Sequence, residues 1–391
     1  MLPQVLDTSL LSAEAISLRN QLLKRVIGQE RAVNQFVKVY QQMKSGMTRN
    51  DRPAGVFLLM GPTGTGKTEL VRAVAETLLG DKNAFTRVDC SEFQQSHETA
   101  KLFGSPPGYI GFDQRREGTA RLSQKNIDKF QTKQNKINLV LFDEIEEAHD
   151  SVFSAILQIL DSRRLTLGNG EEVDFQHSII IMTSNLGEKE TRDALLGKGL
   201  GLKPTTNETI TDEKIYRVSK AAAVKHFKTK FINRIDRIIV FRALEDATFR
   251  LILKKELRDL EFRLWQSKSK DWDRKTPFPQ FQIILRTTNA ADDFLLKEGT
   301  SRLYGARELN RAIERFVAFP LGALSGSGQI EHGDILEVDY IQGEKKLKFT
   351  KIDHRDIKPL PSLTYDGTPS AELMKILLPD PKPEPPREPA K

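Results

Sequence analysis

The chain has 391 residues and a net charge of +7, from 60 Lys and Arg against 53 Asp and Glu. Its length predicts two or three domains, and 38% hydrophobic with 29% charged residues is typical of a soluble globular protein rather than a membrane or disordered one. No secretory signal is visible in the first residues, and the single cysteine, Cys90, excludes an internal disulfide framework, so we expect a cytoplasmic protein.

Short apolar runs predict the strands of a sheet, and they lie at 56–60, 85–89, 139–143, 178–184 and 237–241. Continuous apolar runs suit strands that are buried on both faces. Apolar residues at helical spacing follow the first run, at Leu70, Val74 and Leu78, and the third run, at Val152 and Ile156. This alternation predicts an α/β fold with a five-stranded parallel sheet flanked by helices.

The pattern changes after Phe241. Helices are predicted near 245–265, 289–298 and 306–324, and strands at 281–285, 335–340 and 346–351. Together they indicate a second, smaller α+β domain. The last 36 residues hold half of the 18 prolines, which predicts an extended, disordered tail that is either merely solvated or a docking segment.

The strongest motif is a phosphate-binding loop. Its residues fit the G-x-x-x-x-G-K-[ST] pattern without mismatch and are Gly61, Pro62, Thr63, Gly64, Thr65, Gly66, Lys67 and Thr68. The predicted strand 56–60 precedes the loop and a helix follows, so backbone N–H groups at the helix start can wrap phosphates. Lys67 would reach the β- and γ-phosphates and Thr68 would ligate Mg²⁺, which predicts ATP and Mg²⁺ as the cofactors.

Two acids end the third predicted strand. Asp143 and Glu144 follow the apolar run 139–142, where buried carboxylates are costly unless they have a function. We expect Asp143 to hold the Mg²⁺ shell and Glu144 to accept a proton from the attacking water. The alternative, that both acids only cap a strand end, is weak beside a phosphate loop. Glu146 and Glu147 are read as surface or helix-start residues.

With these motifs placed, the chain resembles the Clp family of AAA+ ATPases, and in particular the second ATPase module of ClpB, ClpA and ClpC. The matching segments occur in the family's order and are LKRVIGQ (23–29), GSPPGYIG (104–111), LVLFDEIEEAH (139–149), LQILDSRRLT (157–166), MTSN (182–185), FINRID (231–236) and YGARELNRAIER (304–315). The resemblance implies an AAA+ P-loop domain followed by a small lid domain. We expect a linker-like segment at 1–25, the large domain at 26–241, the small domain at 242–355 and the tail at 356–391.

The resemblance also assigns roles to residues outside the two motifs. Val26 and Ile27 would lie near the adenine, and Asn185 would act as sensor 1, which positions the attacking water; its alternative is a polar cap at a strand end. Arg234 resembles the arginine finger that reaches a neighbour's γ-phosphate, with Arg237 as a second candidate. A finger supplied in trans implies a ring with sites between subunits.

Three more features follow from the resemblance. Arg307 resembles sensor 2, which contacts the nucleotide of its own subunit. Tyr109 and Ile110 would lie in the pore and grip polypeptide, because an aromatic ring holds many side chains by apolar contact; the alternative for Tyr109 is packing on its own subunit. The stretch 165–172 has an N-G hairpin signal and is a candidate second pore element.

The sequence also departs from the family. We expect one ATPase module only, without an N-terminal substrate domain, and Arg115 and Arg116 stand where paired glycines are usual. Leu200, Gly201 and Leu202 resemble the apolar-Gly-apolar tripeptide with which some members dock a Clp-type peptidase, although a locally packed loop is the alternative.

These observations favour an ATP-dependent protein unfoldase or remodelling chaperone, a hexameric ring that hydrolyses ATP and threads polypeptide. Two alternatives stay open, a regulatory subunit of a Clp-type protease and a non-threading scaffold or switch ATPase. A nucleic-acid-acting machine is disfavoured, because no DNA-binding module is recognisable. We expect no membrane partner.

Overall fold

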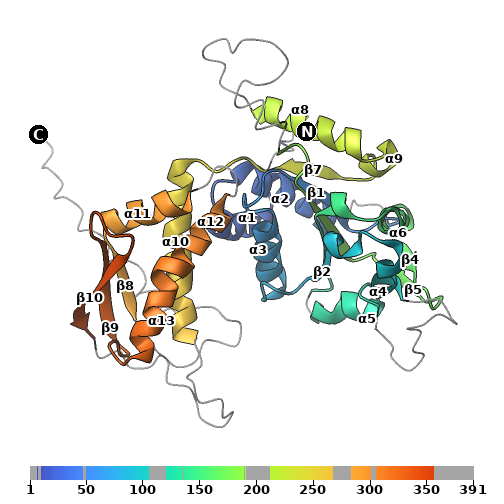
Figure 1. The fold of residues 1–391 in the computed structure, drawn as a ribbon. Coiled ribbons are helices and arrows are strands. Elements are labelled where there is room, and N and C mark those ends of the chain that lie inside the picture. Colours follow the sequence, from blue (N-terminus) through green and yellow to red (C-terminus); the bar gives the residue numbers. More distant parts are fainter. Residues whose placement is uncertain are drawn as a thin grey trace, which may run out of the picture. The chain divides into compact units, whose positions relative to one another are not determined.

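The computed structural model describes residues 10–46, 50–104, 120–133, 135–188, 212–266, 283–300 and 305–355, together with Asp7 and Glu190 (Figure 1). The chain divides into two compact units. Unit 1 comprises residues 1–256 and 292–315, and unit 2 comprises residues 257–291 and 316–391. The domain limits expected from the sequence, with a boundary at 241/242, stay a prediction.

Unit 1 contains a five-stranded parallel sheet, as the sequence predicts (Figure 1). Its strands are β1 (Gly55–Met60), β2 (Thr86–Asp89), β3 (Asn138–Asp143), β6 (Ser178–Ser184) and β7 (Arg237–Val240), in the order β2-β3-β6-β1-β7. The register pairs Asp89 with Asp143 and Met60 with Ser184. The carboxyl ends of the strands therefore meet at one edge, where parallel α/β sheets bind their ligands.

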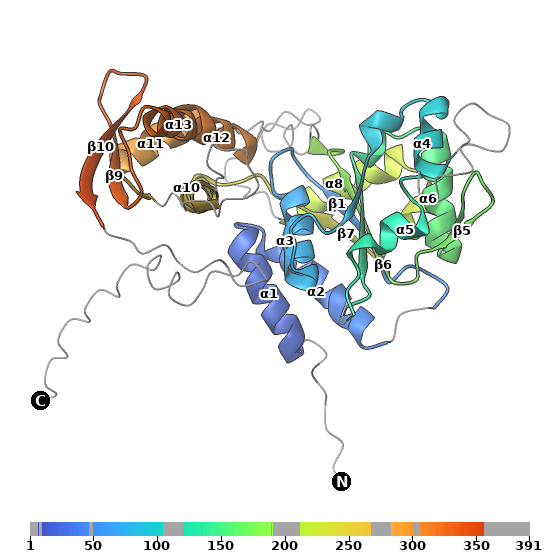
Figure 2. The same ribbon diagram turned by 90° about the horizontal axis from the view of Figure 1, so that it is seen from below.

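Two apolar clusters cover the two faces of this sheet. Strand β1 contributes Val56 and Leu58 to one cluster and Phe57 and Leu59 to the other, because successive side chains of a strand point to opposite faces. The face with Phe57 packs against α1 (Ala13–Arg25), α2 (Glu30–Lys44) and α3 (Lys67–Leu79), and the face with Val56 packs against α6 (Asp150–Ser162), α8 (Asp212–His226) and α9 (Thr229–Ile232). Figure 2 shows α1 and α3 on the side of the sheet opposite to α6.

Smaller elements complete this part of the chain. Short helices α4 (Ala100–Phe103) and α5 (Gln124–Ile127) lie between β2 and β3 in sequence. Strands β4 (Arg164–Thr166) and β5 (Glu172–Asp174) pair antiparallel, so a hairpin forms where the N-G signal predicts one. Among the described residues, no helix combines the length and the apolar character that crossing a membrane requires.

After β7 the chain forms α10 (Asp246–Gln266), β8 (Ile284–Thr287), α11 (Asn289–Gly299), α12 (Ala306–Ile313), α13 (Phe319–Gly326), β9 (Asp334–Tyr340) and β10 (Leu347–His354). Unit 2 holds a mixed sheet in the order β10-β9-β8, with β9 antiparallel to β10 and parallel to β8. Of the strand predicted at 281–285, the described part is β8, which pairs with β9 from Ile284 and ends two residues later than expected; positions 281 and 282 lie outside the described residues. The helix predicted at 306–324 is two α-helices joined by a π-helical turn at Glu314–Ala318.

Candidate functional site

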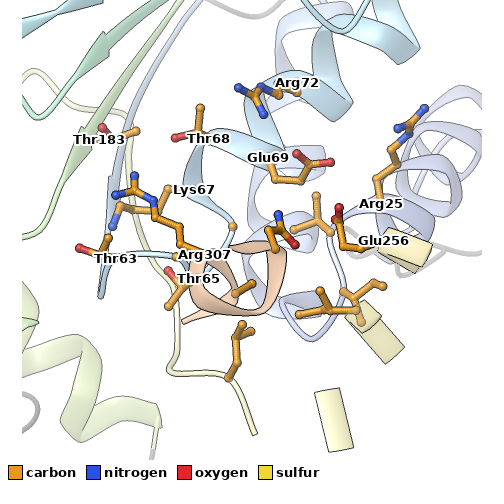
Figure 3. A pocket seen from close by; sticks show the side chains of 18 of the residues that line it. Arg25, Thr63, Thr65, Lys67, Thr68, Glu69, Arg72, Thr183, Glu256 and Arg307 are labelled. Atoms are coloured by element: carbon orange, nitrogen blue, oxygen red, sulfur yellow. The ribbon is translucent and has the colours of Figure 1, made fainter. Parts of the chain in front are cut away.

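A cavity of about 340 Å³ lies in unit 1, at the carboxyl edge of the parallel sheet. The predicted site residues that line it are Val26, Ile27, Thr63, Gly64, Thr65, Gly66, Lys67, Thr68, Asp143, Glu144, Asn185 and Arg307. Figure 3 shows that they come from separate elements, with Lys67 and Thr68 at the start of α3, Arg25 at the end of α1 and Arg307 on α12. The fold thus brings together residues that are more than 280 positions apart in the chain.

The phosphate loop is built around a buried lysine. Lys67 Nζ donates hydrogen bonds to the carbonyl oxygens of Gly61 and Pro62, at 2.5 and 3.0 Å, and to Oδ1 of Asn185 at 2.8 Å. Burial lowers the pKa of Lys67 to about 8. Gly66 precedes α3 with a φ of +103° and no side chain caps the helix, so its first turn leaves N–H groups for an anion.

The two acids after β3 have different surroundings. Asp143 is buried and accepts hydrogen bonds from the Thr183 hydroxyl at 2.5 Å and from Arg87 Nη2 at 2.6 Å. Glu144 lines the cavity with its backbone in the left-handed region, at a φ of 54°, and its N–H donates to Thr183 Oγ1 at 3.0 Å. Burial, together with the negative charge of Asp143, raises the pKa of Glu144. A non-glycine residue in this region is uncommon and marks a constrained turn.

The loop after β6 is held by two further acids. Asn185 N–H donates to Glu146 Oε1 at 2.7 Å, so Glu146 supports the loop that carries Asn185, a role that we did not expect from the sequence. Glu188 Oε2 accepts from the N–H of Thr63 at 3.3 Å and links the same loop to the phosphate loop. The phosphate loop and the loop that carries Asn185 therefore form one hydrogen-bonded unit.

Two segments distant in sequence close the other side of the cavity. The buried Gln29 side chain donates to the carbonyls of Thr65 and Arg242 at 3.1 and 2.9 Å, and accepts from Arg242 N–H at 3.1 Å. At the start of α12, Ala306 N–H donates to the Gly64 carbonyl at 3.0 Å. This contact places Arg307, the next residue, in the cavity.

The remaining predicted residues lie elsewhere. Arg234 does not line the cavity and instead binds Asp161 of its own chain. Tyr109, Ile110 and the segment 200–202 lie outside the described residues, so their roles stay predictions.

Sequence reasoning missed four residues that hold the site together: Gln29, Arg87, Thr183 and Glu188. Gln29 and Thr183 lie within the matching segments 23–29 and 182–185, and Glu188 stands three residues after Asn185, but none of the three was given a role.

Comparisons with known proteins agree with this architecture. The family model described as AAA domain (Cdc48 subfamily) matches residues 52–238, and that described as the C-terminal, D2-small domain of ClpB protein matches residues 276–338. The chaperone protein ClpB of Gloeobacter violaceus is 37% identical over 330 residues, which are 84% of this chain and 34% of that protein. The negative regulator of genetic competence ClpC/MecB of Bacillus subtilis is 36% identical over 336 residues, 86% of this chain and 38% of that protein.

A solved structure has a similar fold. The closed-state reconstruction of Hsp104 with ATPγS and FITC casein has a TM-score of 0.68 and 30% sequence identity, and the match covers 87% of this chain and 53% of that chain. This chain spans about a third of the length of the curated relatives that it matches.

Proposed function

The chain belongs to the Clp family of AAA+ ATPases, and on that premise we propose that it is an ATP-dependent protein unfoldase or remodelling enzyme. It hydrolyses ATP at the interfaces of a homo-oligomeric ring, a hexamer, and moves polypeptide through the central pore. The observation that carries the proposal is the convergence of Lys67, Asp143, Glu144 and Asn185 on one cavity.

The residues present fit a nucleotide with its metal ion. Thr68 and Asp143 line the same cavity, and a hydroxyl with a carboxylate is an oxygen donor set of the kind that Mg²⁺ prefers. These two residues would hold Mg²⁺, which when bound neutralises charge on the β- and γ-phosphates. Lys67, which now binds the carbonyls of Gly61 and Pro62, would contact the phosphate oxygens. Val26 and Ile27 form the apolar wall for the base.

Glu144 and Asn185 act on the attacking water. The raised pKa of Glu144 makes its carboxylate a better proton acceptor than an ordinary surface glutamate. Asn185, whose Oδ1 now binds Lys67, is free to orient the water once that lysine turns to the phosphates. Arg307 adds positive charge to the same cavity from α12.

Replacement of the proposed base tests the hydrolytic part of the proposal. Glu144→Gln removes the proton acceptor but keeps the shape, so ATP turnover should fall by roughly 10²–10⁴ while ATP affinity stays within about threefold. Glu147→Gln is the matched control, since Glu147 contacts Gln94 and does not line the cavity. Equal turnover of Glu144→Gln and the native chain would contradict the assignment.

A second experiment tests the action on polypeptide. Tyr109→Ala should keep ATP turnover and lose the unfolding of a fluorescent substrate protein, whereas Tyr109→Phe should keep both, because the apolar ring remains. Loss of neither activity in Tyr109→Ala would favour a non-threading scaffold or switch ATPase. Capture of polypeptides by Glu144→Gln in ATP would identify the substrates.

A regulatory subunit of a Clp-type protease is the second candidate. In its favour, the chain is 36% identical over 330 residues to ClpC of Staphylococcus aureus, which is named as the ATP-binding subunit of ATP-dependent Clp protease. Leu200 and Leu202 would then contact the peptidase. If neither complex formation nor stimulation of a Clp-type peptidase is found, and the double Ala variant behaves like the native chain, this candidate is wrong.

A further inference from the structure

The proposed arginine finger is held by its own subunit in a defined way. Arg234 Nε binds the carboxylate of Asp161, and its Nη1 donates to the carbonyl oxygen of Lys230 at 2.6 Å. The ammonium of Lys230 lies 3.8 Å from the other oxygen of Asp161. Nη2 has no acceptor among the described residues, although 21% of the Arg234 side chain is exposed. Nε and one N–H of Nη1 are therefore occupied, and the two N–H groups of Nη2 have no acceptor in the described part of the chain.

Asp161 stands where its own helix disfavours an acid. It lies in the last turn of α6, which contains no basic residue, and a negative charge there opposes the helix dipole. The charge of Arg234 offsets this cost, since the two side chains are ion-paired. The position of Asp161 is therefore explained by its contact with Arg234 and not by any stabilisation of α6.

The backbone on both sides of Arg234 is fixed. Three residues before it, the buried Phe231 packs edge-on against Phe153 of α6, with ring centroids 5.6 Å apart. Two residues after it, the Asp236 carboxylate accepts from Val56 N–H at 2.8 Å, and Asp236 N–H donates to the Val56 carbonyl at 3.0 Å. The segment is anchored to α6 and to β1, so the Asp161 contact adds the last constraint, on the side chain itself.

We propose that Asp161 is a positioning residue that holds Arg234 ready for the γ-phosphate of the neighbouring subunit. The inference rests on the proposed function, because it needs Arg234 to act in trans. A guanidinium has five N–H donors in a rigid fork, so Asp161 on Nε and the Lys230 carbonyl on Nη1 leave the two N–H groups of Nη2 available. A displacement of about 1 Å in such a group can cost roughly 10²-fold in rate.

A mixing experiment tests this in the assembled full-length protein. Lys67→Ala subunits cannot use ATP but supply a finger, whereas Arg234→Ala subunits keep the ATP site but lack a finger. Each variant should be nearly inactive alone, and a mixture should regain turnover. Asp161→Ala is then added to either the finger donor or the site donor. Turnover should fall by about 10-fold to 100-fold only when the change is on the finger donor.

The outcomes distinguish the role of Asp161 from the action of Arg234 in trans. Equal loss from both placements, or loss from neither, would overturn the role of Asp161. No recovery in the parent mixture would overturn the trans finger, and the role of Asp161 with it. Asp150→Ala on the finger donor is the matched control, because it removes an exposed acid from the same helix away from Arg234. The affinity of the Arg234→Ala site donor for ATP, measured by fluorescence, should be the same with and without Asp161→Ala.

Discussion

At the scale of single residues, the carboxyl edge of the sheet concentrates negative charge. Asp89 and Asp143 are register partners on adjacent strands, and Glu144 follows directly. Arg87 is the cation that binds this group, at 2.6 Å from Asp143 and 3.4 Å from Asp89. If Mg²⁺ uses the same Asp143 carboxylate, as we propose, Arg87 and the metal ion would compete for it.

Loss of this arginine should therefore make Mg²⁺ bind more tightly. In Arg87→Gln the acids keep their charge and lose their competitor, and we expect the half-saturating Mg²⁺ concentration to fall about threefold to tenfold, as about half of the Arg87 side chain is exposed. The measurement is a Mg²⁺ titration of the fluorescence of a bound ADP analogue. Arg121→Gln is the control, since Arg121 pairs with Glu92 and does not line the cavity. An unchanged or higher Mg²⁺ requirement would show that Arg87 does not compete.

The sequence predicted the residues of this edge only where a local motif contains them. Lys67, Asp143 and Asn185 each belong to a recognisable segment, and the structure places all three on one cavity. Arg87 could not be found in this way, because its contact with Asp143 depends on which strand lies beside β3 and in which register. Pairing of that kind is set by long-range packing rather than by neighbouring residues.

At the scale of elements, a buried carboxyl joins α10 to β8. Glu261 Oε1 accepts from Leu285 N–H at 2.6 Å, and burial raises the pKa of Glu261 from 4.5 to about 7. The folded chain thus binds more protons than the unfolded chain between these two values. The stability that Glu261 contributes by binding this proton is fully present below pH 4.5 and is lost as the pH rises through 7.

Glu261→Gln should remove this dependence on pH. The amide keeps an acceptor for Leu285 N–H and cannot ionise, so the variant should be more stable than the native chain at pH 8, by up to about 3 kcal/mol, and similar to it at pH 4.5. Thermal unfolding at the two pH values measures the difference. The exposed Glu344 offers the control Glu344→Gln, which should follow the native curve. If the difference in stability between Glu261→Gln and the native chain is the same at both pH values, burial does not raise the pKa of Glu261.

The start of α12 depends on a glycine. Gly305 has a φ of +55°, and a Cβ there would lie 2.6 Å from the Gly64 carbonyl oxygen. Gly305→Ala should push α12 away from the phosphate loop, withdraw Arg307 and weaken ATP binding about tenfold, in line with roughly 1–3 kcal/mol for a non-glycine residue in a sparsely populated backbone region. Gly322→Ala in α13 meets no neighbouring atom and should bind ATP normally. Equal ATP dissociation constants for the two variants would contradict the dependence of ATP binding on Gly305.

Elements with strong periodicity could be predicted, and those governed by tertiary pairing could not. The strands of the parallel sheet lie within one residue of their predicted limits, because continuous apolar runs mark strands buried on both faces. Strand β8 ends two residues after its predicted limit, because its end follows from pairing with β9. The π-helical turn at Glu314–Ala318 leaves no signal in a helical apolar pattern.

At the scale of the whole molecule, the cavity lacks one charge that the proposed reaction needs. Arg234 is held by Asp161 and is not among the described residues that line the cavity, so a γ-phosphate there would meet Lys67 and Arg307 of its own chain but not Arg234. If a second copy supplies its Arg234, hydrolysis depends on assembly. The concentration of the chain then controls turnover per chain.

Turnover per chain should therefore rise with protein concentration and reach a plateau where light scattering reports a ring. Below the assembly range it should fall by roughly 10³-fold, the lower end of what an arginine finger contributes in other NTPases. Arg234→Ala should assemble over the same range and show low turnover at every concentration, which separates the finger from the ring itself. Constant turnover from fully dissociated to fully assembled native chain would mean that each subunit hydrolyses ATP on its own.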